Sequence, residues 1–181
     1  MNLPNKITLM RVILIPFFIV FMMLPQGWAK WASLAIFVIA SLTDFVDGQM
    51  ARRMNLVTDF GKFMDPLADK MLVAAAMILF VEIGKIPAWV VIVIIAREFI
   101  ISGFRMMAAE KGVVIAAGWW GKIKTAETMV MLVVLLLFFA MGLEGGAYFW
   151  TEQILIYLSL ALTVISMIDY LLKNKGVIES C

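Results

Sequence analysis

The sequence predicts an all-α integral membrane protein, a bundle of six transmembrane helices with both termini in the cytoplasm and a short interfacial segment at the N-terminus. Of its 181 residues, 64% are hydrophobic and 15% are charged, whereas a soluble domain is nearer half apolar and a quarter charged. Apolar runs of about 20 residues, the length that crosses ~30 Å of hydrocarbon, recur six times. Because one water-soluble core cannot bury that much apolar surface, lipid is the expected solvent.

Three of the segments between the apolar runs contain Gly or Pro and are typical of turns: Pro25–Gly27, Gly84–Pro87 and Glu144–Gly146. The predicted spans are Ile7–Leu24, Trp31–Met50, Phe63–Ile83, Ala88–Ala109, Lys122–Gly142 and Gln153–Leu172. Since no long linker or internal repeat interrupts them, we expect one domain over residues 1–181. The first run follows basic residues, as in a signal peptide, but no small-x-small cleavage site follows it. We therefore expect a retained helix.

The basic residues predict the orientation. Only Lys30 and Lys85 fall on one side of the predicted bundle. The other thirteen lie on the opposite side, which the positive-inside rule places in the cytoplasm: Lys6, Arg11, Arg52, Arg53, Lys62, Lys70, Arg97, Arg105, Lys111, Lys122, Lys124, Lys173 and Lys175. Trp28, Trp31, Trp89 and Trp150 lie at the other ends of the spans, where an interfacial aromatic belt is expected.

The residue types that are missing restrict the chemistry. The chain has no His, and its one Cys is Cys181. This excludes zinc sites built on His or Cys, haem, Cys–His catalysis and an intramolecular disulfide. Any metal must be bound by oxygen atoms, which favours Mg²⁺ or Mn²⁺. The net charge of +2 is too small to indicate nucleic acid.

Four aspartates form the most informative pattern. Asp44 and Asp47 are three residues apart and Asp65 and Asp69 are four apart, so each pair shares one helix face. An ionised Asp within a span costs about 2.5–3.5 kcal/mol at the midplane and less near the interface. Two divalent cations would neutralise the four carboxylates and could clamp a phosphoryl displacement. The pattern therefore favours a dinuclear metal site at the cytoplasmic ends of two successive helices.

Taken singly, these residues have simpler explanations. Asp44 could cap a helix or pair with Arg52, and Asp65 with Pro66 could start a helix. Asp59 is assigned to a loop or cap. Small residues at Gly48, Ala51 and Gly61 could admit a flat group such as a nucleotide base, or could permit close helix packing.

The motif resembles the signature of the CDP-alcohol phosphotransferase family, D-x-x-D-G-x-x-A-R-(x₈)-G-x-x-x-D-x-x-x-D. It covers about a seventh of the chain, and its fixed positions here are Asp44, Asp47, Gly48, Ala51, Arg52, Gly61, Asp65 and Asp69. The resemblance implies that an alcohol hydroxyl attacks the lipid-side phosphorus of a CDP-linked lipid in a cleft that faces the cytoplasm, and that CMP leaves.

The resemblance also implies a role for each motif residue, and that the protein is a homodimer. Asp44, Asp47 and Asp65 would hold two Mg²⁺ or Mn²⁺ ions, and Asp69 would complete the site and act as general base. Arg52 would contact the diphosphate. The cytidine pocket would be shaped by Gly48, Ala51 and Gly61, next to Asp47.

Further basic and polar residues bear on substrate binding. Arg97, Arg105, Lys122 and Lys124 could form an anion pocket for a phosphorylated acceptor, although positive-inside bias alone would place the last three at the same boundary. Arg97 needs a partner within a span, either Glu98 or a substrate anion. A further stripe could bind the headgroup phosphate of the CDP-lipid or could only anchor the helix at the interface: Asn5, Thr8 and Arg11.

These segments resemble bacterial CDP-diacylglycerol–glycerol-3-phosphate 3-phosphatidyltransferases, which implies CDP-diacylglycerol and sn-glycerol 3-phosphate as substrates and a place in the cell membrane. Such sequences often carry Gln where this chain has Thr128, preceded by Glu127. Inositol phosphate, serine or phosphatidylglycerol remain alternative acceptors. A cation transporter is a further alternative, but it would not place arginine beside the acidic cluster. A structural membrane subunit is disfavoured because every motif position is intact.

Overall fold

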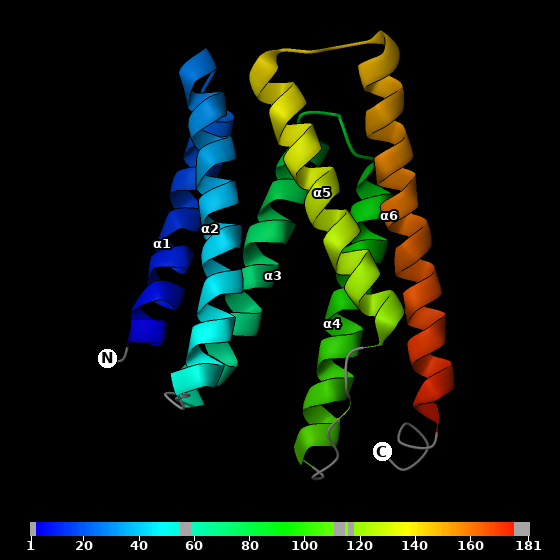
Figure 1. Ribbon diagram of the computed structural model, residues 1–181. Coiled ribbons are helices and arrows are strands. Elements are labelled where there is room, and N and C mark those ends of the chain that lie inside the picture. The colour runs from blue at the N-terminus through cyan, green and yellow to red at the C-terminus, as the bar shows by residue number, and fades with distance from the viewer. Residues whose placement is uncertain (1–2, 55–58, 111–114, 116–117, 176–181) are drawn as a thin grey trace. The chain divides into compact units, whose positions relative to one another are not determined.

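The computed structural model describes residues 3–54, 59–110, 115 and 118–175, and side chains at 9–43, 67–68, 70–108, 115 and 118–175. All regular structure in these ranges is helical, as predicted. The helices, shown in Figure 1, are α1 (Leu3–Met23), α2 (Gly27–Met54), α3 (Asp59–Glu82), α4 (Ala88–Glu110), α5 (Trp119–Met141) and α6 (Gly146–Lys173). Each overlaps one predicted span. The predicted spans of α1, α3 and α5 run one residue past the helix end, and α6 begins seven residues before its predicted start.

The chain divides into two compact units. Unit 1 comprises Met1–Phe80 and Leu132–Glu144, and unit 2 comprises Val81–Met131 and Gly145–Cys181. Helices α3 and α5 each contribute to both. The prediction of a single domain stays a prediction.

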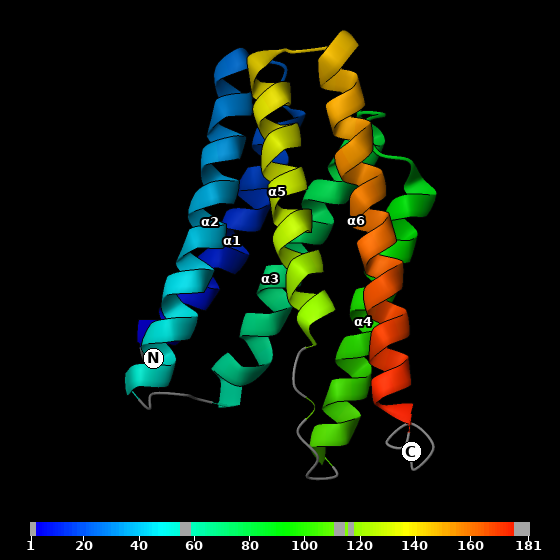
Figure 2. The ribbon, with the colours of Figure 1, turned by 45° about the vertical axis from the view of Figure 1, so that its right-hand side comes forward.

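Unit 1 is built on the pairing of α1 with α2, which lie side by side in both views (Figures 1 and 2). Phe18 and Phe37 are fully buried between them, with ring centroids 5.8 Å apart. Phe80 of α3 packs edge-on against Phe139 of α5, with centroids 6.3 Å apart. The ammonium of Lys30 lies 4.3 Å from the Phe139 ring centroid, a cation–π contact that gives this charge a partner.

Unit 2 is built on α4, α6 and the first half of α5, with α4 packed against α6. A turn at Gly84, whose φ is +82°, precedes α4. The next residue, Lys85, forms a salt bridge with Glu152 in the second turn of α6, at 2.9 and 3.0 Å to the two carboxylate oxygens. The Glu152 side chain is only 2% exposed and that of Lys85 is 19% exposed, so the lysine neutralises a charge that water hardly reaches.

Within the described ranges, two helices are long and apolar enough to cross a membrane, α5 and α6. Shorter apolar helical stretches occur at Leu9–Met23 and Gly27–Thr43. Large apolar side chains are widely exposed, including Phe17 (53%), Ile92 (66%) and Ile154 (64%). Exposed apolar surface of this extent is unfavourable in water and suits lipid. The described helices therefore support a membrane protein, while the count of six spans stays a prediction.

The Lys85–Glu152 pair yields a stability prediction. Lys85→Met should lower the free energy of unfolding in detergent by up to about 3 kcal/mol, because it leaves a buried carboxylate unpaired. The double variant Lys85→Met/Glu152→Met should recover most of that loss. Lys173→Met is the matched control, since Lys173 pairs with Asp169 at 60% exposure and should cost under about 1 kcal/mol. Equal losses for the buried and exposed pairs would contradict this account.

Candidate active site

The four predicted metal-binding aspartates lie on helices, as expected. Asp44 and Asp47 are in the second half of α2, and Asp65 and Asp69 are in the first half of α3. Helical backbone at both places puts the members of each pair on one face. Their side chains lie outside the described residues, so the convergence of the four carboxylates stays a prediction.

The register of the two helices is compatible with that convergence. α2 ends at Met54 and α3 begins at Asp59, and five peptide steps limit the distance between these Cα atoms to about 18 Å. Asp44 is ten residues before the end of α2, and Asp69 is ten residues after the start of α3. Each therefore lies about 15 Å along its helix from the connection, so an antiparallel arrangement would bring them to the same depth.

The helix boundaries decide two of the simpler explanations. α3 begins at Asp59, six residues before Asp65, so the alternative in which Asp65 and Pro66 start a helix is wrong. Asp59 itself is at the helix boundary, as its assignment to a loop or cap implied.

For most of the other motif residues, the structure describes the backbone alone. Gly48, Ala51 and Arg52 lie on α2, Gly61 on α3, and Asn5 and Thr8 on α1, and their side chains are outside the described residues. Arg11 is described: it lies on α1, is 3% exposed, and makes interactions there. Among the residues with described side chains, no group of three or more His, Cys, Asp or Glu could hold a metal.

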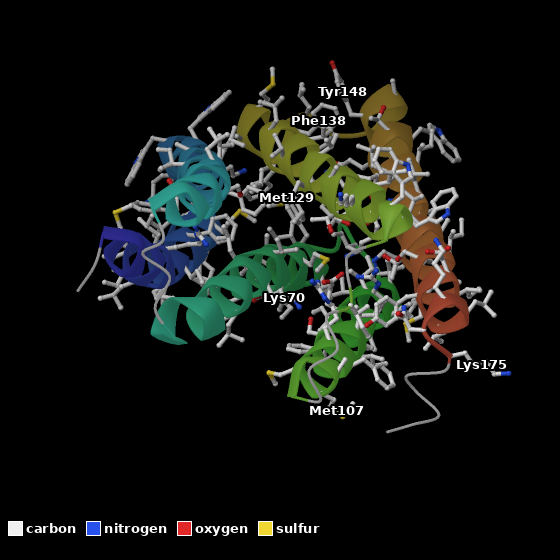
Figure 3. The ribbon with its side chains drawn as sticks, turned by 60° about the horizontal axis from the view of Figure 1, so that its bottom comes forward. Lys70, Met107, Met129, Phe138, Tyr148 and Lys175 are labelled. Carbon is white, nitrogen blue, oxygen red and sulfur yellow. The ribbon has the colours of Figure 1, made fainter. Side chains whose placement is uncertain are left out.

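The predicted acceptor residues on α4 and α5 are described, and two of them meet in unit 2. One oxygen of Glu98 accepts a hydrogen bond from Arg97 Nη1 at 2.9 Å and another from Lys124 Nζ at 2.7 Å. Glu98 is thus the partner that Arg97 was expected to need. Lys124 and Arg97 are 3% and 9% exposed. Figure 3 shows nitrogen and oxygen atoms gathered between α4, α5 and α6.

The charges around this network are mostly positive. Arg97 and Lys124 share the carboxylate of Glu98, and a second acidic residue, Glu127, interacts with Lys124. Arg105 and Lys122, the other two predicted acceptor residues, are exposed and add positive charge near the C-terminal end of α4 and the N-terminal end of α5. The arrangement can therefore bind a phosphate at its buried part and attract one at its exposed part.

Two glycines let the start of α5 approach its neighbours closely. A Cβ at Gly121 would lie 3.6 Å from Arg97 Nη2, and a Cβ at Gly118 would lie 3.3 Å from an Asp169 carboxylate oxygen. A side chain at Gly118 would thus require Asp169 to move. At Gly121 a side chain would make only an ordinary contact with the guanidinium of Arg97, so the tighter requirement for glycine is at Gly118.

Sequence analysis missed the polar face of α6. Its buried residues recur at alternating spacings of four and three, which define one helix face: Glu152, Ile156, Ser159, Thr163, Ser166 and Tyr170. Ser159 and Thr128 of α5 share a hydrogen bond at 2.9 Å. The spacing was visible in the sequence, but hydroxyl residues in an apolar span gave no reason to single them out.

Known proteins resemble this chain over nearly its whole length. A sequence profile described as CDP-alcohol phosphatidyltransferase matches residues 1–165. Three relatives carry the name CDP-diacylglycerol--glycerol-3-phosphate 3-phosphatidyltransferase. That of Bacillus subtilis (strain 168) is 45% identical, over 96% of this chain and 95% of its own. Those of Salmonella typhimurium and Haemophilus influenzae are 44% and 42% identical, each over 97% of this chain and over 96% and 94% of their own.

Both the profile match and these identities extend far beyond the aspartate motif, across the helices of unit 1 and unit 2 alike. The chain therefore belongs to the CDP-alcohol phosphatidyltransferase family.

Proposed function

We propose that the protein transfers the phosphatidyl group of CDP-diacylglycerol to sn-glycerol 3-phosphate, giving phosphatidylglycerol phosphate and CMP. The observation that carries this proposal is the identity of 42–45% to relatives named for this reaction, over nearly the full chain. The complete aspartate motif on α2 and α3 and the cationic network of unit 2 support it with chemistry suited to a diphosphate donor and a phosphorylated acceptor.

The donor set on α2 and α3 fits hard divalent cations. Asp44, Asp47, Asp65 and Asp69 offer only carboxylate oxygens, the ligands that Mg²⁺ and Mn²⁺ accept. Two such ions, when bound, would neutralise the diphosphate and make CMP a better leaving group. Arg52 would add a bidentate contact to the diphosphate, and Gly48, Ala51 and Gly61 would leave room for the cytidine.

Asp69 is the proposed general base. Its carboxylate would take the proton from the attacking hydroxyl as the oxygen–phosphorus bond forms and the bond to CMP breaks. Phosphoryl transfer depends mainly on positioning and charge neutralisation, so no covalent intermediate on the protein is required. With no His in the chain, a carboxylate is the natural base.

The acceptor's phosphate would bind at Arg97 and Lys124, two buried cations that share the carboxylate of Glu98. Arg105 and Lys122 would contact or steer it from the exposed side. Arg11 of α1, with Asn5 and Thr8, would bind the donor's headgroup phosphate. Another alcohol acceptor would use the same metal chemistry, and it remains the alternative within the family.

We propose a multi-pass cell-membrane protein with six spans, both termini and the active site on the cytoplasmic side, and two chains per assembly. The basic residues near the ends of α4, α5 and α6 support this orientation. The helices are 21, 28, 24, 23, 23 and 28 residues long, and each exceeds the about 20 residues that a span requires.

The orientation predicts the labelling of Cys181, the only thiol. A membrane-impermeant maleimide should label Cys181 only after the cells are permeabilised. A Cys181→Ala/Glu144→Cys variant, with its thiol in the loop between α5 and α6, should be labelled in intact cells. Labelling of Cys181 in intact cells would contradict the proposed topology.

The role of Asp69 predicts a large and selective loss of activity. Asp69→Asn should reduce CMP release by at least a hundredfold, with expression near that of the unsubstituted protein. Asp59→Asn is the matched control on the same helix, and it should retain activity because Asp59 is outside the proposed metal set. If Asp69→Asn reduces CMP release by less than about tenfold, Asp69 is not the general base.

The acceptor pocket predicts a split between the two substrates. Arg105→Gln should raise the KM for sn-glycerol 3-phosphate several-fold, with little change in the KM for CDP-diacylglycerol, because Arg105 would contact only the acceptor. Lys173→Gln removes another exposed cation at the cytoplasmic end of α6 and should change neither value. Equal increases for both substrates would place the anion pocket elsewhere.

A further inference from the structure

Polar atoms without partners are concentrated in the interior of unit 2. Among its described residues, five buried side-chain atoms have no hydrogen-bond partner: Arg97 Nε, Glu127 Oε1, Glu127 Oε2, Thr163 Oγ1 and Tyr170 Oη. They come from α4, α5 and α6. A buried polar group costs free energy unless it is hydrogen-bonded. These atoms therefore indicate a site for a polar guest.

Two contacts define the register of α5 against α6. Thr128 of α5 meets Ser159 of α6, and Gly118, ten residues earlier, meets Asp169, ten residues later. The helices thus run antiparallel without slippage. Thr163 follows Ser159 by four residues, and Lys124 precedes Thr128 by four residues. Thr163 and Lys124 therefore lie at the same level along the two helices.

Glu127 lies on the same part of α5. It follows Lys124 by three residues, so their Cβ atoms are about 5–6 Å apart, and the two side chains interact electrostatically. Glu127 also interacts with the Ser159 hydroxyl. That hydroxyl makes its well-aligned hydrogen bond to Thr128, so neither carboxyl oxygen of Glu127 has a hydrogen bond of good geometry. Thr163 is fully buried. The ammonium of Lys124, the carboxyl group of Glu127 and the hydroxyl of Thr163 therefore lie within about one helical turn of each other along the helix axes.

This combination matches a small molecule that carries both a phosphate and hydroxyl groups. A phosphate held by Lys124 and Arg97 would place the rest of a three-carbon chain within reach of the next turn. Carboxyl oxygens accept hydrogen bonds from hydroxyls, and Thr163 can donate or accept. We propose that Glu127 and Thr163 bind the C2 hydroxyl of the acceptor, the hydroxyl that does not attack, and so select a glycerol phosphate over an acceptor without it. This inference rests on the proposed function.

The test compares sn-glycerol 3-phosphate with 1,3-propanediol monophosphate, which lacks the C2 hydroxyl. CMP release by the purified full-length protein would be measured with each acceptor in nanodiscs. The unsubstituted protein should prefer the hydroxylated acceptor by at least tenfold in kcat/KM, the scale of a hydrogen bond to a charged group. Glu127→Met should bring the ratio of kcat/KM for the two acceptors close to one by raising the KM for sn-glycerol 3-phosphate. The KM for CDP-diacylglycerol should stay the same.

Thr163→Val is a second, isosteric variant that keeps the inference testable if the Glu127 variant does not fold. Thr163→Val should lower the ratio of kcat/KM for sn-glycerol 3-phosphate to that for 1,3-propanediol monophosphate about threefold. Thr163→Ser should restore this ratio. Thr151→Val, the same substitution at an exposed position of α6, should leave it unchanged. A purely structural role would affect both acceptors equally.

The outcomes separate this inference from the function on which it rests. If the unsubstituted protein uses both acceptors equally, or if the preference survives in Glu127→Met and Thr163→Val, the site holds water only and the inference is wrong while the proposed reaction stands. If sn-glycerol 3-phosphate yields no CMP and another alcohol does, the proposed function fails and the inference fails with it.

Discussion

The structure depends on one constraint: charged side chains in an apolar helical protein must have partners of opposite charge. Glu98 satisfies it for Arg97 and Lys124 at 2.9 and 2.7 Å, and Lys85 satisfies it for Glu152. Four aspartates on α2 and α3 have the same requirement. Divalent cations are the partners that would meet it and also supply the chemistry of a diphosphate donor.

The two pairings serve different purposes. Lys85 and Glu152 neutralise each other one to one, an arrangement suited to joining the loop before α4 to α6. Arg97 and Lys124 instead share the single carboxylate of Glu98, and Glu127 interacts with Lys124 without a salt bridge of its own. A closed one-to-one pair leaves no group for a ligand, whereas a shared carboxylate leaves donors on both cations. This difference is why we propose the second cluster, and not the first, as the binding site for the acceptor's phosphate.

The six helices and their approximate positions could be predicted from the sequence. Apolar runs of about 20 residues and the turns between them can be recognised from neighbouring residues alone. The start of α2 at Gly27 and of α6 at Gly146, before the predicted Trp31 and Gln153, was missed because a few Gly, aromatic and charged residues extend each helix beyond its aliphatic run. The partner of Arg97 was anticipated, since Glu98 is adjacent. Lys85 with Glu152, and Thr128 with Ser159, were not predicted, because the residues are 67 and 31 positions apart and only the packing of unit 2 joins them.

The most direct test of the central claim is the binding of Mn²⁺ to metal-free protein, measured by calorimetry and electron paramagnetic resonance. The account predicts two ions per chain, with binding lost in Asp44→Asn and Asp65→Asn and kept in Asp59→Asn, and with CMP release rising as the sites fill. Full turnover by protein from which all divalent metal has been removed, or unchanged Mn²⁺ binding in the Asp44 and Asp65 variants, would contradict it.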